Sequence, residues 1–131
     1  MDLTLQTESF GQGNQSWLGS QHGTDMLRPC TLDTSTFTAG THYPAGYFPS
    51  GTSLGRITAT GLYGPYDNAA SDGREVYAGQ LMGDVKAPAV NTVDPSGSLF
   101  EHGRVIVANL PIPASIDAGA RADAAGRIIF V

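Results

Sequence analysis

The sequence predicts a mainly β fold, of the α+β type because one short helix is expected near the end of the chain. Its 131 residues suit one compact domain. Its 17 glycines and 8 prolines favour short strands and many turns over long helices. One stretch, 114–126, combines frequent alanine with residues that begin and end helices.

The first 29 residues differ in composition from the rest. They are rich in Gly, Gln, Ser and Thr, and they have neither helical nor strand periodicity. We therefore expect an extended N-terminal arm over 1–29 and a single β-rich domain over 30–131. Phe10, Trp17 and Leu18 have no obvious packing partner within residues 1–29, so they are interpreted as anchors for a partner protein.

Several stretches of the expected domain have the composition of strands. They are 30–38, read as a short strand and a turn, followed by 55–66, 74–85 and 103–110. The segment 67–73 ends in Asp-Gly, which is typical of a tight turn, so a hairpin is expected between the second and third stretches.

The helix is expected over 114–126. Ser115 can cap its first turn, Asp117 suits the positive end of the helix dipole, and Gly126 suits the left-handed position after the last turn. The apolar residues in 127–131 then predict a closing strand, held beside the others as an internal strand of the fold.

The charges exclude several classes of function. Only 15% of the residues are charged, the net charge is −5, and no two of the seven Lys and Arg residues are adjacent. This pattern argues against binding to nucleic acid, which requires a basic surface. No segment has the length or amphipathic character that suits a membrane. With so few charges to keep copies apart, part of the surface is expected to be covered by partners.

No catalytic, cofactor or metal site is expected. His22, His42 and His102 have no close metal-ligand spacing, and His22 with Asp25 is a weak pairing. Cys30 is interpreted as a small buried apolar residue rather than a nucleophile. The aromatic residues in 42–66 leave two interpretations open: they pack the loops onto a thin core, or they form a contact surface.

The chain resembles the lambda-type head decoration proteins of tailed bacteriophages, which are also called capsid-stabilising or cement proteins. The likeness rests on the polar arm, "TLDTST" (31–36), "SDGREVYAGQL" (71–81), "EHGRV" (101–105) and the ending "ADAAGRIIFV" (122–131). The stretches "HGTD" (22–25) and 40–67 are similar to the version found in phages of actinobacteria. The aromatic, proline-rich segment 42–66 is longer than in the shortest relatives, which leaves its contacts open.

The resemblance implies a β-tulip, with antiparallel strands curled around the C-terminal helix. It also implies a homotrimer on the outer surface of the expanded capsid at three-fold and quasi-three-fold positions. There it would stabilise the virion shell against DNA pressure, after a stage in the host cytoplasm during assembly. The arm would pair with a sheet edge of the major capsid protein. The expected capsid-binding residues are Phe10, Trp17, Leu18, His22 and Asp25.

Other classes of function remain open from the sequence. One is another virion component, such as a tail or fibre module, or a carbohydrate-binding β-domain that uses the loop tyrosines. The other is a small hydrolase, which the lack of a visible nucleophile–base pair disfavours.

Overall fold

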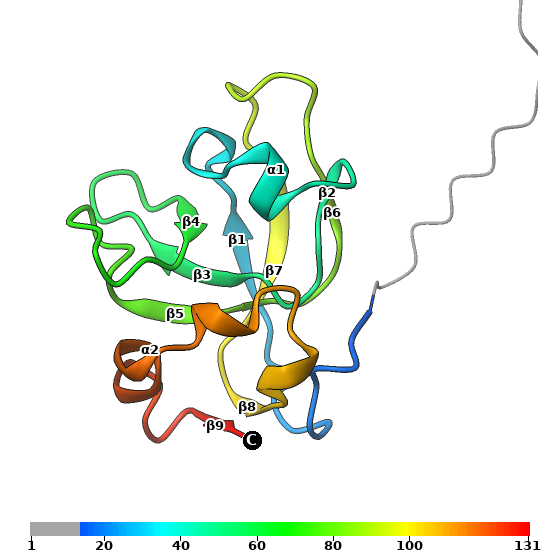
Figure 1. The fold of residues 1–131 in the computed structure, drawn as a ribbon, viewed down its shortest axis with the longest axis vertical. Helices are drawn as coiled ribbons and strands as arrows, with labels where there is room; N and C mark the ends of the chain where they lie inside the picture. Colours follow the sequence, from blue (N-terminus) through cyan, green and yellow to red (C-terminus); the bar gives the residue numbers. More distant parts are fainter. Residues whose placement is uncertain (1–13) are drawn as a thin grey trace, which may run out of the picture.

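The structure is a computed structural model that describes residues 14–131, and Figure 1 shows their arrangement. The strands are β1 (Arg28–Thr31), β2 (Tyr47–Phe48), β3 (Ser53–Arg56), β4 (Tyr63–Pro65), β5 (Tyr77–Leu81), β6 (Val85–Lys86), β7 (Ser96–Phe100), β8 (Gly103–Val105) and β9 (Ile128–Phe130). The helices are α1 (Ala39–His42) and α2 (Ala118–Asp123), and 3-10 turns cover Thr34–Thr36, Val107–Asn109 and Pro113–Ser115. None of the helices in this part of the chain is long and apolar enough to cross a membrane.

The main sheet has five strands in the order β1-β7-β5-β3-β4, and all its pairs are antiparallel. A register shift between Leu54 and Gly55 bends β3 against β5. The sheet curls until its two outer strands meet at one end. There Leu32, directly after β1, bridges Tyr63 of β4, and the Asp33 amide donates to the Tyr63 carbonyl at 2.8 Å.

Two shorter sheets flank the main one. β2 pairs with β6 in an antiparallel ribbon, and β8 pairs with β9 in parallel. Leu18 adds an antiparallel bridge to Val105 on β8. In Figure 1, β8, β9 and α2 lie together at the end of the molecule opposite α1.

Nearly all the buried apolar side chains of residues 14–131 fall into two clusters. The first contains Cys30, Leu32, Phe37, Phe48, Leu54, Tyr63, Leu81 and Leu99, mostly from the main sheet and the segment after β1. The second contains Trp17, Tyr66, Tyr77, Phe100, Val105, Leu110, Ile116, Ala120, Ala124 and Ile128. The second cluster brings both ends of the described chain together, because it joins Trp17 to α2 and β9.

The predicted class is confirmed at the level of a mainly β fold whose main sheet is antiparallel, although residues 14–131 contain two short helices rather than one. The hairpin predicted at 67–73 is wrong, because β3 lies between β4 and β5. The stretch 55–66 itself folds back on β3. Gly61, with φ of +74°, belongs to the tight turn in which its amide donates to the Ile57 carbonyl at 2.8 Å.

The predicted helix is present but shorter, as α2. Asp117 is the residue that caps it, since its carboxylate accepts from the Ala120 amide at 2.9 Å. Ser115, expected as the cap, instead lies in the preceding 3-10 turn and donates to the Ile112 carbonyl. Gly126 does adopt the left-handed conformation after the helix, with φ of +82°.

The closing strand is confirmed as β9, but it is an edge strand rather than an internal one. Within residues 14–131 it pairs with β8 alone. Its side chains alternate between the core and solvent: Ile128 is buried and Phe130 packs on the second cluster, whereas Ile129 is exposed. The strand therefore seals one side of the core and leaves an apolar outer face.

The expectation that 1–29 is an arm separate from the domain fails for the part that the structure describes. Trp17 is 0% exposed and lies at the centre of the second cluster. Its main-chain carbonyl accepts from the Ile106 amide at 2.6 Å, so the segment runs as a neighbour of β8. Long-range packing thus recruits residues that have no local partner. Residues 1–13 lie outside the described residues, and an arm limited to them stays a prediction.

Candidate functional site

The residues predicted to bind a capsid separate into different environments. Trp17 is enclosed in the core, where its indole N–H donates to Ser50 Oγ at 3.0 Å and its ring meets Phe100 edge-on at 5.2 Å. Trp17 therefore belongs to the core and presents no side-chain atoms to a partner. Leu18 is half-buried, His22 and Asp25 are exposed, and Phe10 lies outside the described residues.

The structure brings His22 against His102, which lies 80 residues later in the chain. The Nε2 atom of His22 is 2.8 Å from Nδ1 of His102, and the ring centroids are 4.8 Å apart. Both side chains are exposed. One nitrogen donates and the other accepts, so the pair holds the segment after Trp17 to the turn between β7 and β8.

Two glycines make this contact possible. Each histidine of the pair is followed by glycine, at Gly23 and Gly103. A Cβ on Gly23 would lie 1.8 Å from the His102 carbonyl oxygen, and a Cβ on Gly103 would lie 2.5 Å from the His22 carbonyl oxygen. Both glycines also have positive φ, +82° and +142°. The two His-Gly dipeptides therefore pack main chain against main chain, which brings the imidazoles beside each other.

Two open hollows flank the pair, and we call the region the histidine surface: His22, Met26, Glu101, His102, Arg104, Arg127 and Ile129. One hollow, of about 260 Å³, is lined by residues that include Arg104, Arg127 and Ile129. The other, of about 240 Å³, is lined by His22, Met26, Glu101, His102 and Arg127. Met26 is 67% exposed and Ile129 is 57% exposed. Each hollow is thus lined by one exposed apolar side chain beside polar ones.

Arg127 supports the histidine surface from within. Its guanidinium donates to the carbonyls of Tyr77, Ala78, Glu101 and Asp123 at 3.2–3.3 Å. The charge is therefore turned toward the main chain of β5, α2 and the β7–β8 turn. Across the same turn, Glu101 forms an exposed ion pair with Arg28 at 3.4 Å.

A larger groove of about 560 Å³ runs along the segment 15–27, on the other side from the histidine surface. Its lining residues are Gln15, Leu18, Gln21, Thr24, Leu27, Met82, Gly83 and Ser98. Leu18, predicted as an anchor, lies on its wall between polar neighbours. The segment 15–27 thus presents one side to this groove and its two histidine-surface residues, His22 and Met26, to the other.

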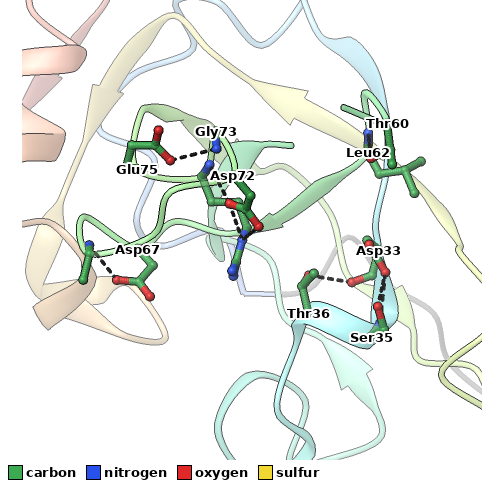
Figure 2. Close-up of polar contacts among 11 residues, drawn as sticks. Asp33, Ser35, Thr36, Thr60, Leu62, Asp67, Asp72, Gly73 and Glu75 are labelled. Atoms are coloured by element: carbon green, nitrogen blue, oxygen red, sulfur yellow. Dashed lines mark hydrogen bonds and ion pairs between the residues drawn. The ribbon is translucent and has the colours of Figure 1, made fainter. Parts of the chain in front are cut away.

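Many of the acidic side chains are used in turns rather than in a reactive cluster. Figure 2 shows Asp33 bonded to Ser35, Asp67 to a turn amide, Asp72 to an arginine and Glu75 to the Gly73 amide. Such bonds fix loop conformations. Within residues 14–131, no group of three or more His, Cys, Asp or Glu side chains is placed to hold a metal ion.

The loop aromatic residues mostly serve the core. Tyr63, Tyr66 and Phe48 are buried, and Tyr43 is half-buried against Phe48 at a centroid distance of 4.9 Å. Tyr47 remains 38% exposed. Of the two interpretations of these aromatics, packing applies to most of them, and only Tyr47 among these five offers a ring to solvent.

Cys30 is expected to resist thiol reagents in the folded protein. It is buried in the first cluster, and burial raises the pKa of its thiol to about 11. The reactive thiolate would form only as the pH rises toward that value, so at pH 8 the thiol stays protonated. Labelling with a disulfide reagent at pH 8 should be slow in buffer and rapid in denaturant. Labelling in buffer as fast as in denaturant would contradict the burial.

One comparison with known protein families matches nearly all the residues that the structure describes. The family model described as bacteriophage lambda head decoration protein D matches residues 17–128, well over half of the chain. The match begins at Trp17 and ends at Ile128, which are both in the second core cluster. No curated protein and no solved structure matches the chain. The chain belongs to the family of the lambda head decoration protein D, the phage proteins that decorate the capsid.

Proposed function

We propose that this protein binds the outer surface of the expanded phage head as a homotrimer, at three-fold and quasi-three-fold positions. The family match over 17–128 carries the proposal. Binding that occurs only on the assembled shell stabilises that shell by mass action, here against the outward pressure of packed DNA. The β-tulip arrangement and the stage in the host cytoplasm belong to the same proposal.

Exposed apolar residues support a covered surface. Met26 and Ile129 are exposed on the histidine surface, Val131 is exposed after β9, and Val90 and Val93 are exposed in the loop before β7. These residues would be covered by neighbouring copies or by the major capsid protein. Together with the low content of charged residues, they fit a chain that works as part of an assembly.

The proposed attachment device is an arm over residues 1–13, which pairs with a sheet edge of the major capsid protein. Extended residues span about 3.3–3.6 Å each, so a segment of this length reaches roughly 40 Å. Three arms per trimer make the attachment multivalent. Phe10 within the arm, and Leu18, His22 and Asp25 at its base, are the proposed capsid contacts.

The test is cosedimentation of the purified protein with expanded capsids, followed by imaging of the decorated shells. We expect binding, and density centred on the three-fold and quasi-three-fold positions. Sedimentation of the free protein measures its oligomeric state. Density at other positions, or no binding to expanded shells, would overturn the proposal.

Removal of residues 1–13 is expected to weaken capsid binding while the melting temperature of the free protein stays close to that of the full chain. The reason is that Trp17 and the rest of the second cluster remain in place. The matched control is a variant with Phe10→Ala in the full chain, which should weaken binding less than the deletion. Full occupancy of capsids by the truncated protein would show that attachment depends on other residues.

A further inference from the structure

We propose that His22 and His102 form a binding site for a divalent transition-metal ion, with Cu²⁺ preferred over Ni²⁺ and Zn²⁺. The proposal concerns the free protein and does not depend on capsid binding. It rests on the geometry of the imidazole pair and on the two glycines that hold it.

The distance between the nitrogens fits two ligands of one ion. Metal–imidazole bonds are about 2.0–2.1 Å long, so two such ligands at adjacent positions lie about 2.9–3.4 Å apart. Nε2 of His22 and Nδ1 of His102 are separated by 2.8 Å. A turn of both rings about their side-chain bonds, with a slight widening of the pair, would point both nitrogens at one ion beside the line that joins them. The shared proton moves through solvent to the other nitrogen of the same ring, so each neutral imidazole carries its one proton on the nitrogen that faces away from the ion.

The main-chain segments that carry the two ligands are held together before any ion binds. Gly23 lies against the His102 carbonyl and Gly103 lies against the His22 carbonyl, so the two main-chain segments cannot easily separate. The amide of Gly103 also donates to the Arg127 carbonyl at 2.9 Å. Ligands held in place lose less conformational freedom on binding, which favours affinity.

The surroundings leave room for the remaining ligands. Both imidazoles are exposed and line the hollow of about 240 Å³, so water can complete the coordination. Met26 lines the same hollow with a thioether, and Glu101 lines it with a carboxylate that is paired with Arg28 at 3.4 Å. Arg127, the cation that shares it, is engaged with main-chain carbonyls. With two imidazole ligands and no group of three ligand residues in the described chain, affinity should follow the usual order for nitrogen ligands.

An ion at this position would brace the segment that leads into the fold. It would join residue 22 to the turn between β7 and β8, beside the strand that pairs with β9. Because it binds the folded arrangement, it should raise the stability of the domain.

The test is calorimetric titration of the full-length protein with Cu²⁺, Ni²⁺, Zn²⁺ and Mg²⁺, with thermal melts in the presence of each ion. We expect one Cu²⁺ per chain, weaker Ni²⁺ and Zn²⁺ binding, no Mg²⁺ binding, and a rise in melting temperature that a chelator reverses. Nitrogen couplings in the electron paramagnetic resonance spectrum of the copper form should indicate two imidazoles.

Variants locate the ion. His22→Gln and His102→Gln should each weaken Cu²⁺ binding by at least about tenfold. Loss of a residue that only hydrogen-bonds to a metal ligand already lowers affinity by about that factor, and here the ligand itself is lost. His42→Gln is the matched control, because His42 bonds to the Thr38 amide in α1 and should leave binding unchanged. Copper that binds equally well to the double variant H22Q/H102Q, as it would at the terminal amine, overturns the proposal. So does wild-type protein that binds none of the three transition-metal ions.

Discussion

Trp17→Ala is expected to destabilise the domain by about 3–5 kcal/mol, the usual cost of emptying a large aromatic site in a core. Trp17 is fully buried, its ring packs edge-on against Phe100, and its N–H donates to Ser50 Oγ. Domains of ordinary stability have only about 5–15 kcal/mol in total. The variant should therefore melt at a much lower temperature or fail to fold, as measured by thermal or denaturant unfolding.

The matched variant is Trp17→Phe, which keeps an aromatic ring in the site and removes the indole N–H. It should lose less stability than the alanine variant, since most of the packing remains. Deleting residues 1–20 should be as damaging as Trp17→Ala, whereas deleting 1–13 should not. An alanine variant that unfolds cooperatively at the parent temperature would show that Trp17 is not a core residue.

The difference between the expected arm and the observed segment has a physical origin. Local pattern shows that residues near Trp17 have neither helical nor strand periodicity, and the structure agrees, since only an isolated bridge forms at Leu18. Periodicity does not report a single side chain that inserts between distant elements. Trp17 shares its cluster with Phe100, Val105 and Ile128, which lie more than 80 residues away along the chain. The sequence therefore predicts the absence of regular structure correctly and the absence of packing wrongly.

The same reasoning explains the strands. β1, β5, β8 and β9 lie in or overlap stretches whose apolar residues and flanking turns predict them. β7 was missed because three of its five residues are serine or glycine, and its pairing with β1 and β5 defines it as a strand. β3 and β4 were merged into one stretch, since the turn between them is closed by main-chain bonds that composition does not reveal.

The histidine surface left a signal in the sequence that spacing rules for metal ligands do not use. Two of the three histidines are followed by glycine, at 22–23 and 102–103. A His-Gly dipeptide by itself indicates only a turn. The pairing becomes visible when the main chains pack together through those glycines, a contact between residues 80 positions apart. Three-dimensional structure was required to bring the two dipeptides to one place.

Deletion of residues 128–131 is expected to abolish folding. It removes β9, whose pairing completes β8, and it takes Ile128 and Phe130 away from the second cluster. Phe130 also packs edge-on against Tyr77 and lies under the Arg121 guanidinium, 5.5 Å from its ring centre. Burying one such apolar side chain contributes about 1.5–3 kcal/mol, so losing both, with the strand pairing, removes a large part of the stability of a domain. Expression in soluble form and circular dichroism measure the result.

Two neighbouring isoleucines on β9 differ in burial, so their alanine variants distinguish the effect of side-chain burial from that of strand pairing. Ile128 is 5% exposed and Ile129 is 57% exposed. Ile128→Ala should cost about 2–5 kcal/mol, as emptying a buried aliphatic site usually does. Ile129→Ala should change stability by no more than about 0.5 kcal/mol, as is usual at the surface. Since both variants keep the main-chain pairing with β8, the difference between them measures what the inner face of β9 contributes.

Equal losses of stability in the two variants, or a protein without residues 128–131 that melts cooperatively near the full-length temperature, would show that β9 does not seal the core. A stable Ile129→Ala variant that binds capsids less well would assign the outer face of β9 to the assembly.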